Sequence, residues 1–475
     1  MSRKRLTPWG MLTMLTLGAA VSPGAAGPAT GPLRVCEANR RYFTDGSGKA
    51  IYLTGSHTWA NRQERAYPET PAFDFDAYLD FMQRRHHNFM RLWAWEHTAW
   101  MQFTDRKIVY KPNRYARTGP GKALDGGPKF DLTKFNEEYF DRLRSRVIAA
   151  RDRGIYVAVM LFQGFSIEQK GAAGVDPKKG NPWDGHPFNR ANNINDIDGD
   201  ANGNGEGEET HTLAIPEIAR LQEAYVRKVV DTVNDLDNVL YEISNESHGG
   251  STEWHYHMIE CIHTYEATRP KQHPVGMTFT WGGKNSGTNA DLFNSPAEWI
   301  SPNPAADDDY NYRKNPPPAN GSKVVISDTD HLWGIGGNQA WVWKSFCRGL
   351  NPIFMDPYLD ARTGHEMDPQ WDPIRKSMGY TRIFAERMNL TAMTPHAELA
   401  STAYCLANPG HEYLVYLPGG GDVTVDLSAA DGTFVLEWFD PSAGRTSLGG
   451  TTKGAANREL TTPFAGDAVL YIRGE

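Results

Sequence analysis

The stretch NVLYEISNES, residues 238–247, joins an apolar run typical of a buried strand to a polar pair, Asn245 and Glu246, at its end. In a barrel of parallel strands, the carboxyl ends of the strands form the edge at which ligands bind. An asparagine followed by a glutamate at that edge is typical of a site where an amide holds a sugar hydroxyl beside a proton donor. The stretch therefore predicts that Glu246 is a catalytic residue of a barrel.

Seven further strand-like runs accompany this one and alternate with longer segments that carry apolar residues at helical spacing, such as 134–154 and 215–235. This alternation is the rhythm of βα units around a parallel sheet. It predicts a (β/α)8 TIM barrel over residues 30–393. The eight expected strands span residues 51–59, 88–96, 155–163, 239–246, 274–281, 298–304, 323–330 and 352–358.

After residue 394 the chain changes to short alternating runs separated by turn signals such as PGGG, SAADG and DPSAG. Runs of this kind are typical of antiparallel strands. We expect a small antiparallel β-sandwich domain over residues 394–475. The pattern does not decide whether this domain packs as an accessory or binds a ligand.

The composition narrows the class of protein. With 475 residues, 40% hydrophobic residues and a formal net charge of -8, the chain suits two domains and carries no basic field for holding phosphates. Nucleic acid is therefore not expected as a partner. The 14 Trp, 20 Tyr and 20 Phe offer flat apolar faces that suit sugar rings, although core packing also explains many of them.

Residues 1–29 combine a basic start, an apolar middle and small residues near Ala25 and Ala26, which predicts a signal peptide and a secreted or periplasmic protein. No other run approaches the roughly 18 to 20 apolar residues of a membrane span, so none is expected in the mature chain. The four cysteines are too scattered for a disulfide scaffold, although export permits one or two bridges.

Cleavage of a glycosidic bond generally needs two carboxyl groups on opposite sides of the sugar. Glu246 supplies one, and the expected seventh strand, KVVISDTDHLWG, supplies Asp328 and Asp330. These two aspartates have the same strand parity and are both expected to point to one side. Both remain candidates, and Asp328 is the preferred one.

Other polar and aromatic residues follow the expected strands at the same edge, and their shared position predicts a substrate pocket. Arg91 is expected either to keep the attacking carboxylate ionised or to form a structural ion pair inside the barrel. Each of the others can also be a packing residue. The predicted substrate-binding residues are His57, Trp59, Arg91, Trp93, Trp95, Glu96, Gln163, Asn245, Trp281, His331, Trp333, Asp356 and Tyr358.

The segment DGDANGNGEGEE, residues 198–209, has the spacing of a calcium loop, in which alternating oxygens and a final glutamate surround a hard cation. The spacing therefore predicts a structural Ca²⁺, and no cofactor is expected for catalysis. A flexible surface loop is the alternative, because glycine and asparagine dominate the segment. The expected ligands are Asp198, Asp200, Asn202, Asn204 and Glu209.

Residues 40–475 resemble glycoside hydrolases of clan A, and more closely the apiosidase-like barrels that carry a C-terminal β-sandwich described as collagen-binding. The resemblance rests on Arg91, Asn245 and Glu246, an acid after the seventh strand, and the endings YLVYLPGGGDVTVDL, FVLEWFDPSAG and DAVLYI. It implies that Glu246 is the acid/base, that Asn245 grips a sugar hydroxyl and that the reaction retains the anomeric configuration. The clan's nucleophile is normally a seventh-strand glutamate. The shorter aspartate here leaves open a closer backbone, an inverting reaction through water, or loss of activity.

Three classes of function follow. The leading hypothesis is a secreted glycoside hydrolase that acts on an extracellular polysaccharide or oligosaccharide. The second is a non-catalytic carbohydrate-binding or adhesive protein that keeps the barrel pocket. The third, a metal-dependent hydrolase that uses the acidic loop, has less support because no histidine cluster follows the expected strands.

Overall fold

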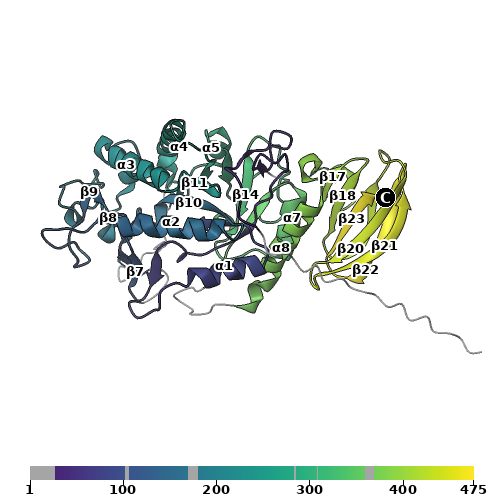
Figure 1. Cartoon of the computed structure of the whole chain (residues 1–475), viewed down its shortest axis with the longest axis horizontal. Helices are drawn as coiled ribbons and strands as arrows, with labels where there is room; N and C mark the ends of the chain where they lie inside the picture. The colour runs from purple at the N-terminus through teal and green to yellow at the C-terminus, as the bar shows by residue number, and fades with distance from the viewer. Residues whose placement is uncertain (1–26, 102–105, 170–179, 283–284, 308, 359–367) are drawn as a thin grey trace, which may run out of the picture.

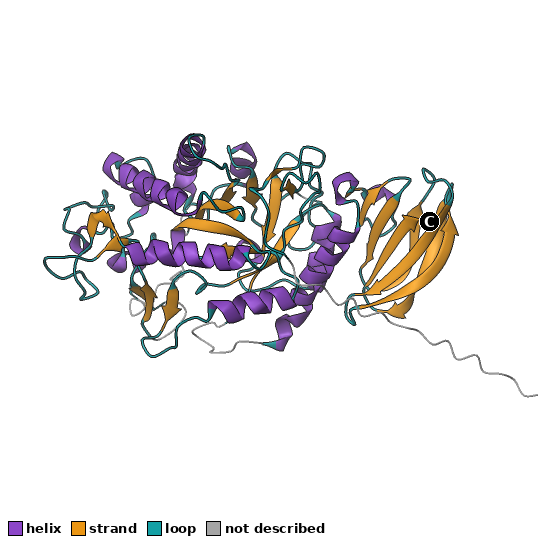
Figure 2. Cartoon of the chain, in the orientation of Figure 1, coloured by secondary structure: helices purple, strands orange, loops and turns teal. Residues whose placement is uncertain are grey.

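Eight parallel strands close into a barrel (Figures 1 and 2). The computed structural model describes residues 27–101, 106–169, 180–282, 285–307, 309–358 and 368–475, so most of the expected signal peptide lies outside the described residues. The strands follow the chain order around the barrel, and the amides of Asn88 and Phe89 donate to the Thr54 carbonyl at 2.9 and 3.2 Å to join the first strand to the second. They are β3 (Gly55–His57), β5 (Phe89–Leu92), β10 (Tyr156–Gln163), β11 (Val239–Asn245), β12 (Val275–Thr278), β13 (Trp299–Ser301), β14 (Val324–Asp328) and β15 (Asn351–Met355).

Every residue of β10 and β11 is buried, as expected of strands covered on both faces. The two strands pair in parallel with Met160 opposite Glu242 and Gln163 opposite Asn245. This register brings the end of β10 beside the end of β11. The polar residues that end the two strands therefore meet at one edge of the barrel.

Helices surround the barrel and cover the outer face of the sheet (Figure 2). Asn136 illustrates how a helix begins, because its side-chain oxygen accepts a hydrogen bond from the Glu138 backbone amide at the start of α2. The (β/α)8 barrel is confirmed, except that the described residues between β13 and β14 include no α-helix. The helices are α1 (Phe75–Arg84), α2 (Glu137–Arg151), α3 (Pro216–Val233), α4 (Thr252–Glu266), α5 (Asn289–Asn294), α6 (Thr329–Leu332), α7 (Gln339–Cys347) and α8 (Asp372–Arg387).

The C-terminal part forms antiparallel sheets around a core of its own, as predicted. A six-stranded sheet faces a two-stranded one, β19–β22. The six-stranded sheet has the order β16-β17-β18-β23-β20-β21. The strands are β16 (Thr394–Pro395), β17 (Cys405–Asn408), β18 (Glu412–Leu417), β19 (Gly420–Asp426), β20 (Thr433–Asp440), β21 (Arg445–Lys453), β22 (Asn457–Ala465) and β23 (Ala468–Gly474).

The sandwich packs against α7 and α8 of the barrel (Figure 1). Trp343 of α7 is fully buried there, with its ring stacked on Tyr416 and tilted against Phe439. At the rim, Arg387 of α8 donates to both carboxylate oxygens of Glu437 at 2.8 and 2.9 Å. A shared apolar core of this kind fixes the two domains relative to each other.

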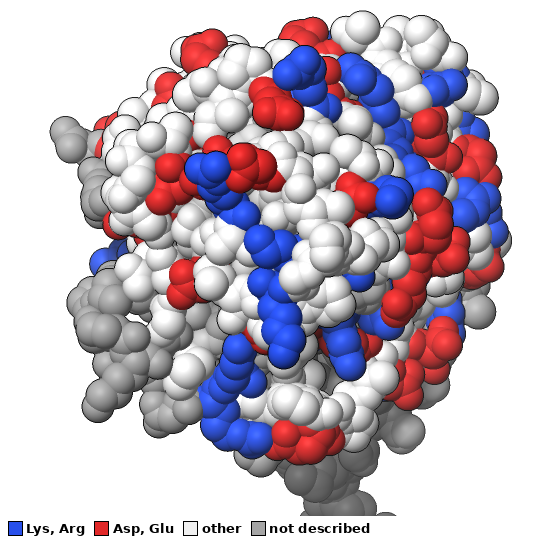
Figure 3. Space-filling view, turned by 90° about the vertical axis from the view of Figure 1, so that its left-hand side faces the viewer, with Lys and Arg blue, Asp and Glu red and all other residues white. Residues whose placement is uncertain are grey.

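Several short strands form small sheets outside the barrel sheet. Acidic and basic side chains are interspersed over the end of the barrel farthest from the sandwich (Figure 3). Within the described ranges, no helix combines the length and the apolar composition needed to span a bilayer. All four cysteines are described, and each is a free thiol. The short strands are β1 (Arg34–Val35), β2 (Phe43–Thr44), β4 (Glu64–Ala66), β6 (Ala99–Trp100), β7 (Ile108–Lys111), β8 (Tyr115–Ala116) and β9 (Asp131–Phe135).

Candidate active site

A cavity of about 580 Å³ opens at the carboxyl ends of the barrel strands. Its walls are mostly aromatic, and two carboxyl groups, Glu246 and Asp330, reach it from different strands. Flat apolar walls with a few convergent polar groups are what a sugar ring requires of a binding site. The aromatic lining residues are Trp59, Trp93, Trp95, Phe165, Phe279, Trp281 and Trp333.

Glu246 directly follows β11 and has a φ of +45°, in the left-handed region. This conformation costs a non-glycine residue roughly 1–2 kcal/mol, so the surroundings must impose it. Gly164 contributes, because a Cβ atom at that position would overlap the Glu246 carbonyl group. The sharp turn ends the alternation of β11 at the residue whose carboxyl group lines the cavity.

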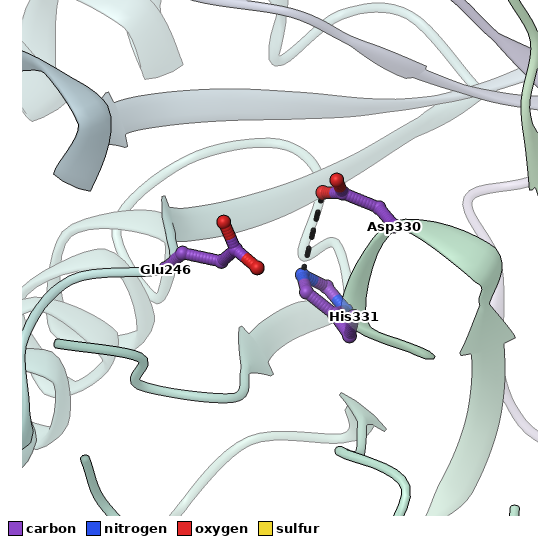
Figure 4. A group of neighbouring side chains, drawn as sticks. All are labelled: Glu246, Asp330 and His331. Atoms are coloured by element: carbon purple, nitrogen blue, oxygen red, sulfur yellow. Dashed lines mark ion pairs between the residues drawn. The ribbon is translucent and has the colours of Figure 1, made fainter. Parts of the chain in front are cut away.

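Asp330 faces Glu246 across the cavity (Figure 4). A carboxylate oxygen of Glu246, one of Asp330 and a ring nitrogen of His331 all lie within 4.8 Å of one another. The Asp330 side chain is 7% exposed, whereas that of Asp328 is fully buried and lies outside the cavity lining. The geometry therefore favours Asp330 as the second carboxyl group of the site, whereas the sequence favoured Asp328.

Asp328 forms hydrogen bonds with other residues in the interior of the barrel. Its carboxylate accepts hydrogen bonds from His57 Nε2 at 2.9 Å, from Arg91 Nη1 at 2.8 Å and from the Asp330 backbone amide at 2.9 Å. The last bond makes Asp328 the cap of α6, a single helical turn. Asp328 thus orients the residues around Asp330, and its own oxygens are fully occupied.

Arg91 links the carboxyl groups of two strands. Its Nε and Nη2 donate to the two oxygens of Glu242 at 2.8 and 2.6 Å, and its Nη1 donates to Asp328 at 2.8 Å and to Asp330 at 3.0 Å. Arg91 therefore forms an ion pair inside the barrel and also contacts Asp330, one of the two candidate aspartates. Glu242 escaped the sequence analysis, although a single charged residue inside an apolar strand was a usable signal.

The two aspartates differ in their affinity for protons. Burial raises the pKa of Asp328, but the charges of His57 and Arg91 outweigh burial and hold that pKa well below its usual range. Burial also raises the pKa of Asp330, Arg91 opposes this effect, and the nearby Asp328 charge adds to it, so that the pKa of Asp330 reaches about 6. A pKa of about 6 brings the change of charge of Asp330 close to neutral pH.

His331 lies beside Glu246 and Asp330. Burial, assisted by the charge of Arg91, lowers the pKa of His331 to about 3, so its ring is neutral. Nδ1 lies 2.7 Å from the Ser301 hydroxyl and Nε2 lies 3.1 Å from the Asn245 amide oxygen, which accepts from it. The spacing of Glu246, Asp330 and His331 would also suit a metal ion, but both ring nitrogens already have partners.

Seven of the predicted catalytic and substrate-binding residues besides Glu246 line the cavity, and the other eight support it from behind or lie elsewhere. The lining ones are Trp59, Trp93, Trp95, Trp281, Asp330, His331 and Trp333. Behind the wall, Asn245 accepts from Arg91 at 2.6 Å and donates to Gln163 at 3.2 Å, and the ring of His57 stacks on Trp93.

Glu96, Asp356 and Tyr358 do not line the cavity, in contrast to the prediction for the strand ends. Glu96 turns inward to a buried group of histidines and Arg114. Asp356 accepts from Arg375 Nε at 2.7 Å, and Tyr358 packs in the core with its ring 4.9 Å from that of Phe81. β5 and β15 end at Leu92 and Met355, so strand alternation no longer fixes the direction of these later side chains.

Several lining residues were absent from the sequence analysis because they lie in loops or continue an apolar run. Phe165 follows β10 by two residues, and Phe279 directly follows β12. Arg313 comes from the segment between β13 and β14 and donates from Nε to the Leu332 carbonyl. The remaining ones are Asn303, Pro304, Leu332, Gly334, Ile335 and Met355.

The acidic loop 198–209 is stabilised largely by its own backbone. The Asp200 carboxylate accepts from the amides of Asn204 and Gly205 at 3.1 and 2.8 Å, and Asn202 Oδ1 accepts from the amide of Asn204 at 2.8 Å. Oε2 of Glu209 is buried without a hydrogen-bond partner, as a metal-ligand oxygen would be. Among the described residues, however, no three acids of the loop bring their oxygens within 4.8 Å of one another.

Two family profiles match parts of the chain. Residues 73–286 match "Domain of unknown function (DUF6298)", and residues 393–472 match "Putative collagen-binding domain of a collagenase". No curated protein matches the sequence.

Solved structures share the whole architecture. One named "Glycoside hydrolase" is 15% identical, with coverage of 94% of this chain and 97% of its own and a TM-score of 0.59. A family 5 glycoside hydrolase from Bacteroides vulgatus ATCC 8482 is also 15% identical, with coverage of 93% of each chain and a TM-score of 0.60. At these identities the likeness establishes the fold, a TIM barrel followed by an antiparallel sandwich.

Proposed function

We propose that this protein is a secreted glycoside hydrolase that cleaves O-glycosidic bonds of an extracellular polysaccharide or oligosaccharide. The observation that carries the proposal is the pair of carboxyl groups from β11 and from the turn after β14, which face each other across an aromatic cavity. The names of the two structural neighbours described above, both given as glycoside hydrolases, support it. Membership of the apiosidase-like group stays a prediction from the sequence.

The separation of the two groups favours retention of configuration. Retaining glycosidases hold their carboxyl groups about 5–5.5 Å apart, whereas inverting ones need about 6.5–9.5 Å to admit a water molecule. Oxygens of Glu246 and Asp330 lie within 4.8 Å of each other, which suits the shorter class. Asp330 would attack the anomeric carbon and form a glycosyl ester, while Glu246 protonates the departing oxygen and later deprotonates water.

The anomeric configuration of the first product tests this function. Polysaccharides and aryl glycosides would be screened for turnover, and the best substrate would be followed by proton NMR from the first minutes. We expect an initial product with the configuration of the substrate, because two successive displacements restore it. An inverted product would remove Asp330 as nucleophile, and the absence of turnover across the panel would favour the carbohydrate-binding alternative.

The pH dependence of kcat/KM should show an acidic limb set by Asp330, whose pKa is raised to about 6. Below that pH the protonated carboxyl group cannot attack, so we expect kcat/KM to fall about tenfold per pH unit. Unfolding would not cause this loss through Asp330, because a raised folded-state pKa makes its contribution to stability larger as the pH falls through 6. A level profile down to pH 4, with the fold intact by circular dichroism, would contradict the assignment.

We also propose that the loop 198–209 binds a structural Ca²⁺ through oxygens of Asp198, Asp200, Asn202, Asn204 and Glu209. Support comes from the spacing of these residues and from the unpartnered oxygen of Glu209. Chelation should lower the melting temperature by about 5 °C, and added Ca²⁺ should restore it. Asp200→Asn should melt at one temperature with and without chelator. A wild type that is insensitive to chelation would exclude the site.

A further inference from the structure

A buried chain of hydrogen bonds leads from Glu96 toward the back of Glu246. Glu96 Oε1 accepts from the Gln163 backbone amide at 2.9 Å and from His211 Nε2 at 2.8 Å. His211 Nδ1 lies 3.0 Å from the Ser247 hydroxyl, which in turn lies 2.7 Å from the Ser244 hydroxyl. All of these side chains are buried, and Ser247 directly follows Glu246 in the chain.

The donor and the acceptor of each hydrogen bond in this series follow from the charges. Burial raises the pKa of Glu96, but Arg114 and His211 outweigh burial and hold that pKa well below its usual range, so Glu96 can only accept. Burial lowers the pKa of His211 to about 4, so its ring is neutral and carries one proton. That proton lies on Nε2, facing Glu96. Nδ1 therefore accepts from Ser247, and the Ser247 oxygen accepts from Ser244.

The environment of His211 leaves its ring a single orientation. The ring stacks on Trp254 with centroids 4.6 Å apart and planes inclined by 9°. Arg114 donates to the other oxygen of Glu96, and His186 Nε2 lies 3.4 Å from the same oxygen. A buried and closely hydrogen-bonded group of this kind is rigid.

Two contacts hold the backbone that follows the Cα atom of Glu246. Gly164 packs closely against the Glu246 carbonyl, and His211 holds the side chain of the next residue, Ser247. Both contacts lie directly after the Cα atom of the left-handed residue, whose φ is +45°. Relaxation of that backbone toward the ordinary strand region would change the direction of the Glu246 side chain by a large angle.

We propose that His211, held by Glu96, is a positioning residue for Glu246: it fixes Ser247 and thereby keeps the carboxyl group of Glu246 directed into the cavity. This inference rests on the proposed function, in which Glu246 donates a proton to the leaving group. It gives Glu96 a role in place of the direct sugar contact that the sequence suggested. Neither Glu96 nor His211 lines the cavity.

The leaving-group dependence of the reaction separates positioning from general damage. A misplaced acid slows the cleavage of a phenyl glycoside, whose leaving group needs a proton, but spares a 2,4-dinitrophenyl glycoside, whose leaving group departs as the anion. Both glycosides would carry the sugar that the wild type hydrolyses fastest. We expect Ser247→Ala and His211→Gln to lower kcat/KM on the phenyl glycoside about 10- to 100-fold and on the dinitrophenyl glycoside less than about threefold.

His186→Gln is the matched control, because His186 contacts the same carboxylate but not Ser247. It should leave the ratio of the two kcat/KM values unchanged. Equal losses on both substrates in Ser247→Ala, or no loss on either, would overturn the inference while the proposed function stands. If the wild type hydrolyses neither glycoside and no polysaccharide of the panel, the proposed function falls, and the inference falls with it. Ser247→Ala removes one hydroxyl and keeps the test decisive if His211→Gln fails to fold.

Discussion

Glu246→Gln should lower kcat on a natural polysaccharide substrate by about 10²- to 10⁴-fold and leave ligand affinity largely unchanged. The amide has nearly the same shape as the carboxyl group, so the cavity and its aromatic walls persist, whereas the proton donor is lost. The effect should be strongest for leaving groups that need a proton. Steady-state kinetics, together with calorimetric binding of an oligosaccharide, separate the two quantities.

Glu253→Gln is the matched control for this change. Glu253 is an exposed residue in the first turn of α4, only seven positions further along the chain, and it lies outside the cavity. The control should keep wild-type kcat. If Glu246→Gln also kept it, the acid/base assignment would be wrong, and a loss of binding together with turnover would indicate a role in substrate affinity instead.

Asp330→Asn should abolish turnover, with a loss of more than about 10⁴-fold in kcat, because no other group would form the covalent bond to the sugar. Its effect on stability should be small. Burial already disfavours the charged form of Asp330, and Arg91 would keep its bonds to Glu242 and Asp328. The variant should therefore melt close to the wild type and still bind oligosaccharide.

Asp328→Asn gives the contrasting result. Its carboxylate is fully buried between His57 and Arg91, so removal of the charge should destabilise the fold by about 3–5 kcal/mol. Denaturant unfolding of both variants distinguishes the aspartate that reacts from the one that orients its neighbours. A stable, inactive Asp328→Asn beside an active Asp330→Asn would reverse the assignment.

The barrel could be predicted from the sequence because each strand is a local apolar run, and eight such runs that alternate with helical segments are typical of a (β/α)8 barrel. The position of Glu246 at the cavity was predictable for the same reason, since β11 ends one residue before it. The choice between Asp328 and Asp330 was not. Strand alternation placed both on one side, but β14 ends at Asp328, which caps α6, and the helical turn directs Asp330 to the cavity instead.

Contacts between distant loops were also beyond the sequence. Glu96 meets Arg114, His186 and His211, whose positions depend on long connections after β5 and β10. The local periodicity of the sequence cannot predict contacts between residues in such distant loops. Trp59, Trp93 and Trp95 line the cavity within three residues of the ends of β3 and β5, whereas Arg313 reaches it from a segment without an α-helix in its described part.

Trapping of the covalent intermediate tests the central claim most directly. A 2-deoxy-2-fluoro glycoside with a dinitrophenyl leaving group, built on the sugar identified by the panel, slows the second step so that the glycosyl enzyme accumulates. Peptide mapping by mass spectrometry should then find one fluorosugar attached to Asp330 in the wild type and none in Asp330→Asn. An adduct on Asp328 or on any residue outside the cavity would contradict the account.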